Sequence, residues 1–141
     1  MNTKHRVKKL IQKSGSEAKA NGKPGLAAQL KVRDMPLFKY LEEAMPTETI
    51  EHTIILFDPK RLSDYIEFME PACSVFAEGM IPIATEPNGD SYLVQKESGE
   101  LHLCPASLED RTFNGVKANS LETFHNVDTF FEELLTVLDI D

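Results

Sequence analysis

The stretch "MIPIATEPNGDSYLVQKESGELHL", residues 80–103, decides the fold that this sequence predicts. Three apolar runs are separated by two short polar turns, an Asn-Gly pair at 88–89 and a Ser-Gly pair at 98–99. Asn and Gly tolerate the positive φ angles that a tight hairpin turn requires. We therefore expect three consecutive antiparallel strands, a meander, in which Pro82 marks an edge or a bulge of the first strand.

The third of these strands has two chemically different faces. Because successive side chains of a strand point to opposite sides, Leu101 and Leu103 are expected on one face of the sheet. His102 and Cys104 are expected together on the other face.

Helices and a further strand are expected before the meander. The stretch 34–45 predicts a helix with Pro36 in its first turn, and 49–57 has the β-branched density of a strand. Asp58 followed by Pro59 predicts the start of a second helix. The expected inward residues are Leu37, Tyr40, Leu41 and Ala44 in the first helix and Leu62, Tyr65, Ile66 and Met69 in the second, which should end before Pro71.

The C-terminal end carries the strongest helix signal. Thr129 and Glu132 have the spacing of a capping box, and Asp128 places negative charge in the first turn. The buried stripe is expected to consist of Phe130 or Phe131 with Leu134, Leu135 and Leu138. With another short strand over 120–125, the sequence predicts an α+β domain whose C-terminal helix packs on the sheet.

Charge is distributed unevenly along the chain. Residues 1–33 contain nine Lys and Arg against one acidic residue, a formal charge of +8. The rest of the chain contains six basic and 22 acidic residues, a formal charge of -16. Such an asymmetry points to charged partners and says nothing about the fold.

The basic N-terminal part is expected to lie outside the folded body. Within 4–13, Val7, Leu10 and Ile11 share one helix face, but ten residues are too few for a stable isolated helix. The stretch 14–25 contains three glycines, which is typical of a flexible linker. The sequence thus predicts a basic arm and linker over residues 1–33 and a folded domain over residues 34–141, beginning between Leu26 and Asp34.

Three roles are open for this arm. It is a solvated tail, or it binds a polyanion such as RNA, DNA or an anionic membrane surface, or it lies against an acidic protein surface. That last surface belongs either to this chain or to a neighbour. The candidate arm residues are Lys4, Arg6, Lys8, Lys9 and Lys13.

The order of motifs resembles the SUKH superfamily, the Smi/Knr cell-wall-regulator family with many bacterial immunity proteins. The resemblance extends over residues 50–138. The matching positions are "ILFDP" at 55–59, Ile81-Pro82-Ile83-Ala84, Asn88-Gly89-Asp90, Gly99 and Phe130-Phe131-Glu132.

The resemblance implies a curved, mostly antiparallel sheet wrapped by helices and a non-enzymatic binding function. Bacterial members are thought to neutralise toxins, often nucleases, by direct binding. The acidic body is independently suited to such a partner, because a nuclease face that holds phosphates is basic. The expected partner-binding residues are Glu86, Asn88, Asp90, Glu97 and Glu100. The alternative is a structural adaptor of a larger viral or nucleoprotein assembly, anchored by the basic arm.

Other chemistries are less well supported by the sequence. His102 and Cys104 supply half of a zinc site, and His52, Cys73 and His125 have no matching spacing. No nucleophile, base and oxyanion set can be named, so we expect no enzyme activity, no metal and no cofactor. The two cysteines lie among apolar neighbours without the short spacing of a metal site, which favours reduced thiols over a disulfide framework. Together with the lack of an apolar run of about 18 residues, this predicts a cytoplasmic protein without a membrane span. The oligomeric state is open.

Overall fold

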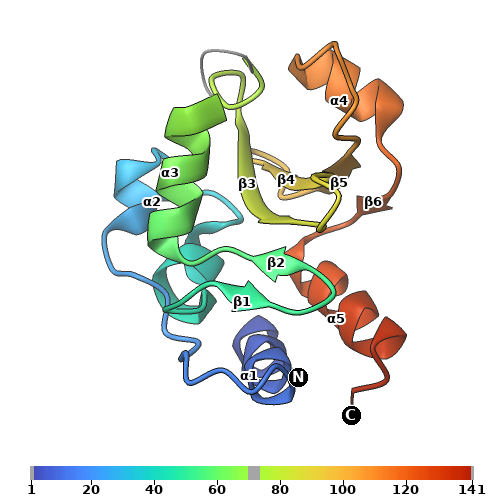
Figure 1. Cartoon of the computed structure of the whole chain (residues 1–141). Coiled ribbons are helices and arrows are strands. Elements are labelled where there is room, and N and C mark those ends of the chain that lie inside the picture. The colour runs from blue at the N-terminus through green and yellow to red at the C-terminus, as the bar shows by residue number, and fades with distance from the viewer. Residues whose placement is uncertain (1, 70–73, 141) are drawn as a thin grey trace.

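A computed structural model describes residues 2–69 and 74–140 of the chain. The strands are β1 (Ile50–Glu51), β2 (Ile55–Leu56), β3 (Met80–Thr85), β4 (Ser91–Gln95), β5 (Leu101–Cys104) and β6 (Thr123–Phe124). The helices are α1 (Thr3–Lys13), α2 (Leu26–Gln29), the π-helix η1 (Tyr40–Ala44), α3 (Pro59–Met69), α4 (Phe113–Asn119) and α5 (Val127–Val137). All six strands form one antiparallel sheet in sequence order, with the helices around it (Figure 1), so the predicted α+β class is confirmed.

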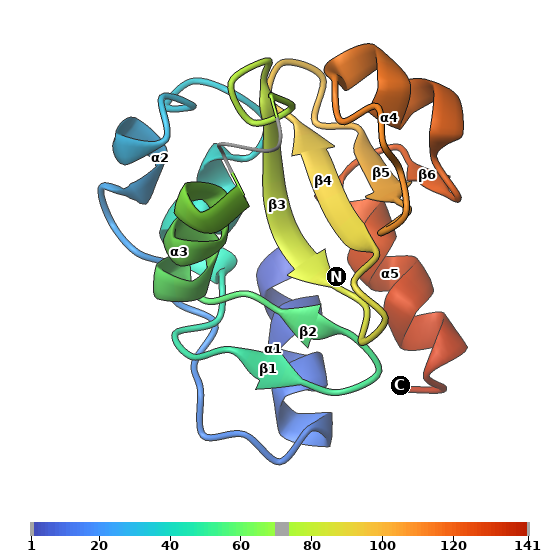
Figure 2. The ribbon, with the colours of Figure 1, turned by 45° about the horizontal axis from the view of Figure 1, so that its top comes forward.

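The predicted meander is present as β3, β4 and β5, which lie side by side in Figure 2. Its first turn contains Gly89 at φ 97°, and its second contains Gly99 at φ 77°. The register between β3 and β4 shifts between Pro82 and Ala84, which confirms the bulge. β2 pairs with β3 at Ala84 and Thr85, beyond Pro82, and the proline itself pairs with Leu93 of β4.

The strand expected over 49–57 is instead a hairpin of two short strands. In β1 and β2, Ile50 pairs with Leu56 and Glu51 pairs with Ile55. The N–H of His52 donates to the carbonyl oxygen of Ile54 at 2.9 Å and closes the turn between them. Of the β-branched residues in this stretch, Ile50 and Ile55 lie in strands, whereas Thr53 and Ile54 lie in the turn where the chain reverses.

The start of α3 is confirmed in detail. The side chain of Asp58 accepts a hydrogen bond from the N–H of Arg61 at 3.0 Å, which satisfies an amide at the helix start. Leu62 is fully buried, whereas Tyr65 and Ile66 are partly buried against the core. The predicted stop at Pro71 and the cysteine Cys73 lie outside the described residues.

The helix expected over 34–45 is reduced to the short π-helix η1. The residues predicted to face inward from this stretch are all buried: Leu37, Tyr40, Leu41 and Ala44. The carbonyl of Leu41, which would accept from Met45 in an α-helix, accepts from the N–H of Lys23 at 2.8 Å. The N–H of Met45 therefore donates to Tyr40 at 2.8 Å, and the turn widens.

The C-terminal helix α5 begins earlier than the capping-box pattern predicts. Asn126 caps it, since its side chain accepts from the N–H of Thr129 at 2.7 Å. Phe130, Phe131 and Leu135 are buried, which confirms the stripe. Strand β6 lies within the predicted stretch 120–125, whereas helix α4 was not expected from the sequence.

The two faces of the sheet carry separate apolar clusters. On one face, residues of α1, η1 and α5 pack against the side chains of the meander that include Leu101 and Leu103. On the other face, Leu93 and Cys104 pack with Val116 of α4 and with partly buried residues of α3. The predicted alternation along β5 is therefore present.

The main core includes residues from the predicted N-terminal arm. Val7 and Leu10 are fully buried and Ile11 is 5% exposed, all in α1. In Figure 1, α1 lies at the base of the molecule, and it packs against both α5 and η1. The sequence places the start of the folded body between Leu26 and Asp34, whereas this core extends to both sides of that boundary.

The stretch 14–25, expected as a flexible linker, is held against η1. Ala20 forms a β-bridge with Pro46, and the N–H of Gly22 donates to the carbonyl of Met45 at 2.8 Å. A Cβ atom at residue 22 would lie 2.3 Å from the backbone of Glu42, so only glycine allows this approach. The glycine that suggested flexibility therefore serves close packing.

Candidate functional site

A groove of about 620 Å³ runs along α5, and its lining charges all have one sign. It is bounded by the β1–β2 turn at Thr53 and Ile54, the end of β3, strand β6 and one side of α5. Figure 1 shows the tip of the β1–β2 hairpin directed toward α5. We call this the acidic groove because its charged lining residues are Glu86, Glu122, Glu132 and Glu133, with no Lys, Arg or His.

The four carboxylates of the acidic groove differ in their partners. Glu86 accepts a hydrogen bond from the hydroxyl of Tyr92 at 2.9 Å. Burial raises the pKa of Tyr92, and this hydrogen bond to Glu86 raises it further, so the phenol stays a neutral donor. Glu132 lies 3.5 Å from Arg6, whereas Glu122 and Glu133 have no ion pair within the described part of the chain.

The floor of the acidic groove is aromatic and aliphatic. Tyr92 lies 4.9 Å from Phe130 between ring centroids, and Phe124 lies 5.3 Å from Phe130. These rings tie β4 and β6 to α5. Leu134 is partly buried beside them, and Val137 is 82% exposed at the end of the groove.

Three of the predicted partner-binding residues form one braced turn between β3 and β4. Asn88 accepts from the N–H of Asp90 at 3.0 Å and donates to its carboxylate at 3.1 Å. The same carboxylate accepts from the N–H of Ala106 at 2.8 Å, which ties the turn to the loop after β5. Glu86 opens this turn and also lines the acidic groove. Asp90 therefore braces this turn.

The other two predicted residues lie at the opposite end of the meander. Glu97 and Glu100 belong to the turn between β4 and β5, where the N–H of Glu100 donates to Ser98 at 3.1 Å. The five residues of β4 separate this turn from the first by roughly 16 Å. The five predicted residues therefore form two groups and not one patch.

The predicted arm residues also form two groups: Arg6, which contacts its own chain, and the lysines. Arg6 forms an ion pair with Asp128, which also accepts from the hydroxyl of Thr3 at 2.9 Å. The Arg6 side chain is 12% exposed and binds an acidic surface of its own chain. The hydrogen bonds from Arg6 and Thr3 lower the pKa of Asp128, against the opposing effect of burial.

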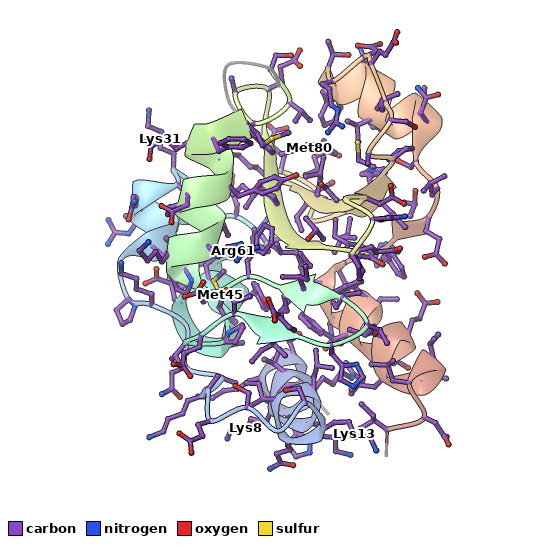
Figure 3. All side chains as sticks on the ribbon, in the orientation of Figure 1. Lys8, Lys13, Lys31, Met45, Arg61 and Met80 are labelled. Carbon is purple, nitrogen blue, oxygen red and sulfur yellow. The ribbon has the colours of Figure 1, made fainter. Side chains whose placement is uncertain are left out.

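The lysines of α1 point elsewhere. Lys8 and Lys13 are exposed, and Lys4 and Lys9 are half-buried. Figure 3 labels Lys8 and Lys13 beside α1, at the edge of the molecule farthest from α4. They remain available for contact with another molecule.

A buried polar network surrounds His102, which is 2% exposed. Its Nδ1 lies 2.9 Å from the hydroxyl oxygen of Ser120, and its Nε2 lies 2.9 Å from Glu100 without the alignment of a hydrogen bond. This order of hydroxyl, imidazole and carboxylate is that of a hydrolase triad. However, Ser120 donates to the carbonyl of Val116 at 2.7 Å, as the end of α4. The network therefore joins β5 to α4 and does not present a nucleophile.

Burial lowers the pKa of His102, although the neighbouring Glu100 opposes this shift. The imidazole is therefore expected to be neutral at neutral pH. Cys104 is also buried, and its thiol lies 3.6 Å from the carbonyl oxygen of Pro105. Within residues 2–69 and 74–140, no three His, Cys, Asp or Glu side chains are placed to hold a metal ion.

A second hollow of about 530 Å³ lies where the N-termini of α1 and α5 meet η1. Its charged lining is mixed, with Lys4 and Lys39 against Glu43 and Asp128. The acidic groove differs because all its charges have one sign. None of the helices in the described part of the chain is both long and apolar enough to span a bilayer.

Sequence reasoning found Glu86 but missed the other three glutamates of the acidic groove. Glu132 was noted as a helix-capping residue, and Glu122 and Glu133 carried no local signal. They come together only because β6 and α5 pack beside the β3–β4 turn. No protein-family model, curated protein or solved structure matches this chain.

Proposed function

We propose that this protein is a non-enzymatic binding module that recognises a basic protein partner through its acidic surface. The observation that carries the proposal is the acidic groove, where four glutamates and no basic residue line a hollow of about 620 Å³. A surface of one sign speeds association with a partner of the opposite sign and disfavours wrong partners.

The best-fitting partner is a nuclease toxin that this protein neutralises in the cytoplasm. A nuclease needs a basic face to hold phosphates, and carboxylates can occupy that face in their place. The resemblance to the SUKH superfamily supports an immunity role of this kind. Glu86, Asn88 and Asp90 would contact the partner next to the groove, and Glu97 and Glu100 would form a separate contact at the other end of β4.

The test uses the full chain and a toxin encoded beside its gene. Binding is measured by titration calorimetry at about 50 mM and about 500 mM salt, which changes the screening length several-fold. We expect the affinity to fall as salt rises and to fall when Glu97 and Glu100 are both changed to Lys. Equal affinity at the two salt concentrations would show that electrostatic recognition is wrong.

A second function, the structural adaptor, is favoured by the lysines of α1. Lys8, Lys9 and Lys13 belong to a helix without any acidic residue, so its outer side could hold a polyanion or an acidic subunit. Because α1 contributes to the core, removing residues 1–25 would confuse binding with folding. The matched test is the triple change of these lysines to Gln: loss of RNA binding or of assembly, with toxin binding unchanged, favours the adaptor.

A further inference from the structure

We infer that the acidic groove binds a partner segment in which bulky apolar side chains are flanked by Lys or Arg. The inference rests on the proposed function and names the surface and the chemistry that it recognises. It places the main contact at β6 and α5, beyond the turns of the meander that the sequence indicates.

Charge is the first reason for a basic segment. Glu122 and Glu133 have no ion pair in the described part of the chain, and both are exposed. Glu86 is oriented by the Tyr92 hydroxyl at 2.9 Å, which leaves its other carboxylate oxygen for an incoming donor. Several separate carboxylates along one groove are suited to several Lys or Arg side chains, since guanidinium and ammonium groups donate to carboxylates.

The apolar lining is the reason for a bulky side chain among the charges. Val137 is 82% exposed and Leu134 is partly buried, although both lie beside the ring cluster of Phe124 and Phe130. Covering these side chains removes apolar surface from water. A purely cationic chain would leave this part of the groove unused.

The shape of the groove limits the length of the segment. A volume of about 620 Å³ falls within the range of roughly 300–1,000 Å³ typical of small-ligand sites. It therefore accommodates a few side chains of an extended or helical segment and not a whole domain.

Other occupants fit less well. The glutamates repel the phosphates of nucleic acid and of anionic lipid. A metal ion needs converging ligands, and no three suitable side chains in the described ranges meet in that way. The basic outer side of α1 from a second copy, with Lys8, Lys9 and Lys13, has the required charge. However, no exposed bulky apolar side chain lies between these lysines.

The probe is a capped peptide, acetyl-Lys-Arg-Phe-Lys-Leu-Arg-amide, titrated into the isotopically labelled full chain and followed by amide chemical shifts. Two peptides serve as controls: one with Glu in place of every basic residue, and one with Gly in place of Phe and Leu. We expect shifts at residues of the acidic groove for the first peptide, weaker binding for the Gly peptide and none for the Glu peptide.

Matched variants assign the binding to the groove. Glu122→Lys with Glu133→Lys should weaken peptide binding about tenfold, because two attractive charges become repulsive. The control pair Glu67→Lys with Glu109→Lys changes the net charge equally at exposed sites outside the groove and should alter binding less than about twofold. Val137→Ser should reduce the preference for the Phe-containing peptide over the Gly peptide.

Each remaining outcome overturns the inference in a recognisable way. Equal loss with both variant pairs would mean that only net charge matters. Shifts confined to residues 96–100, with salt-sensitive toxin binding retained, would overturn the groove and leave the proposed function standing. Self-association of the chain that the groove variants abolish would identify a second copy as occupant. Salt-insensitive toxin binding without peptide binding would overturn both proposals.

Discussion

The helices α1 and α5 are equal in length and pack against each other, but their sequences differ in what they reveal. Each spans 11 residues. In α1, five Lys and Arg surround a stripe of three buried aliphatic residues, and no acid is present. In α5, three acids and no basic residue accompany two phenylalanines and other buried side chains.

This difference shows why one helix was predicted as core and the other as an arm. The aromatic stripe of α5 is too large to leave in water, so its burial follows from its sequence. The short stripe of α1 gains stability only by packing against its neighbours η1 and α5, and Arg6 adds an ion pair with Asp128 of α5. The opposite charges of the two helices thus help to place a segment that its own composition would leave exposed.

The largest expected effect is the loss of Phe131 from α5. This side chain is fully buried, with ring contacts of 5.6 Å to Tyr40 and 5.0 Å to Phe130. Phe131→Ala should lower the free energy of unfolding by about 4 kcal/mol, because it removes apolar contacts and leaves a cavity. Urea denaturation measures this change. Val137→Ala, at an exposed position six residues further along the same helix, should change it by less than about 0.5 kcal/mol.

The next effect tests α1 as part of the core. Leu10→Ala should lower the free energy of unfolding by about 3 kcal/mol, since Leu10 is fully buried. Gln12→Ala, on the exposed side of the same helix, is the matched control and should be almost neutral. If the two variants unfold at the same urea concentration as the unaltered chain, α1 is an independent arm after all and the comparison between the helices fails.

The ion pair between the helices should contribute less. Asp128→Asn is expected to cost about 1 kcal/mol or less, because the carboxylate is 45% exposed and screened by water. The folded-state pKa of Asp128 is lowered, so its contribution is complete above the unfolded value of about 3.9 and is lost as pH falls through the folded value. Thermal unfolding of both forms across this range should show curves that converge at acid pH. A constant difference down to the lowest pH would contradict the assignment.

The smallest effect on stability is expected on the outer side of α1. The triple change of Lys8, Lys9 and Lys13 to Gln should alter the free energy of unfolding by less than about 1 kcal/mol, since Lys8 and Lys13 are exposed and Lys9 is only half-buried. A larger loss would mean that the basic residues of α1 stabilise the fold beyond Arg6. The same variant then separates a structural from a binding role for these lysines.

Local chemistry explains how much of the fold could be predicted from the sequence. The Asn-Gly turn, the bulge at Pro82 and the cap at Asp58 depend on residues within a few positions of each other. The hairpin of β1 and β2 could not be predicted in this way, because the stretch 49–57 is rich in β-branched residues and contains no Gly, Pro, Asn or Asp to indicate a turn. The π-helix η1 also could not, since Lys23 takes the carbonyl of Leu41 from outside the helix.

The candidate site was predictable only in part for the same reason. Glu86 is adjacent to a recognisable turn, whereas Glu122 and Glu133 become neighbours of Glu86 only through the packing of β6 and α5. Glu97 and Glu100 are close to Glu86 in sequence, but the length of β4 keeps them at the other end of the sheet. Nearness in sequence is therefore a poor guide to a shared surface in a meander.

By itself, the sequence determined the α+β class, the meander, the caps and turns, and the opposite charges of the two parts of the chain. These depend on residue type and short spacing, which the unfolded chain already contains. Only the tertiary structure decided that α1 belongs to the core and that four glutamates line one groove. Such features require contacts between distant residues, as between Arg6 and Asp128, 122 positions apart. Their free energy is gained only when the whole chain has folded.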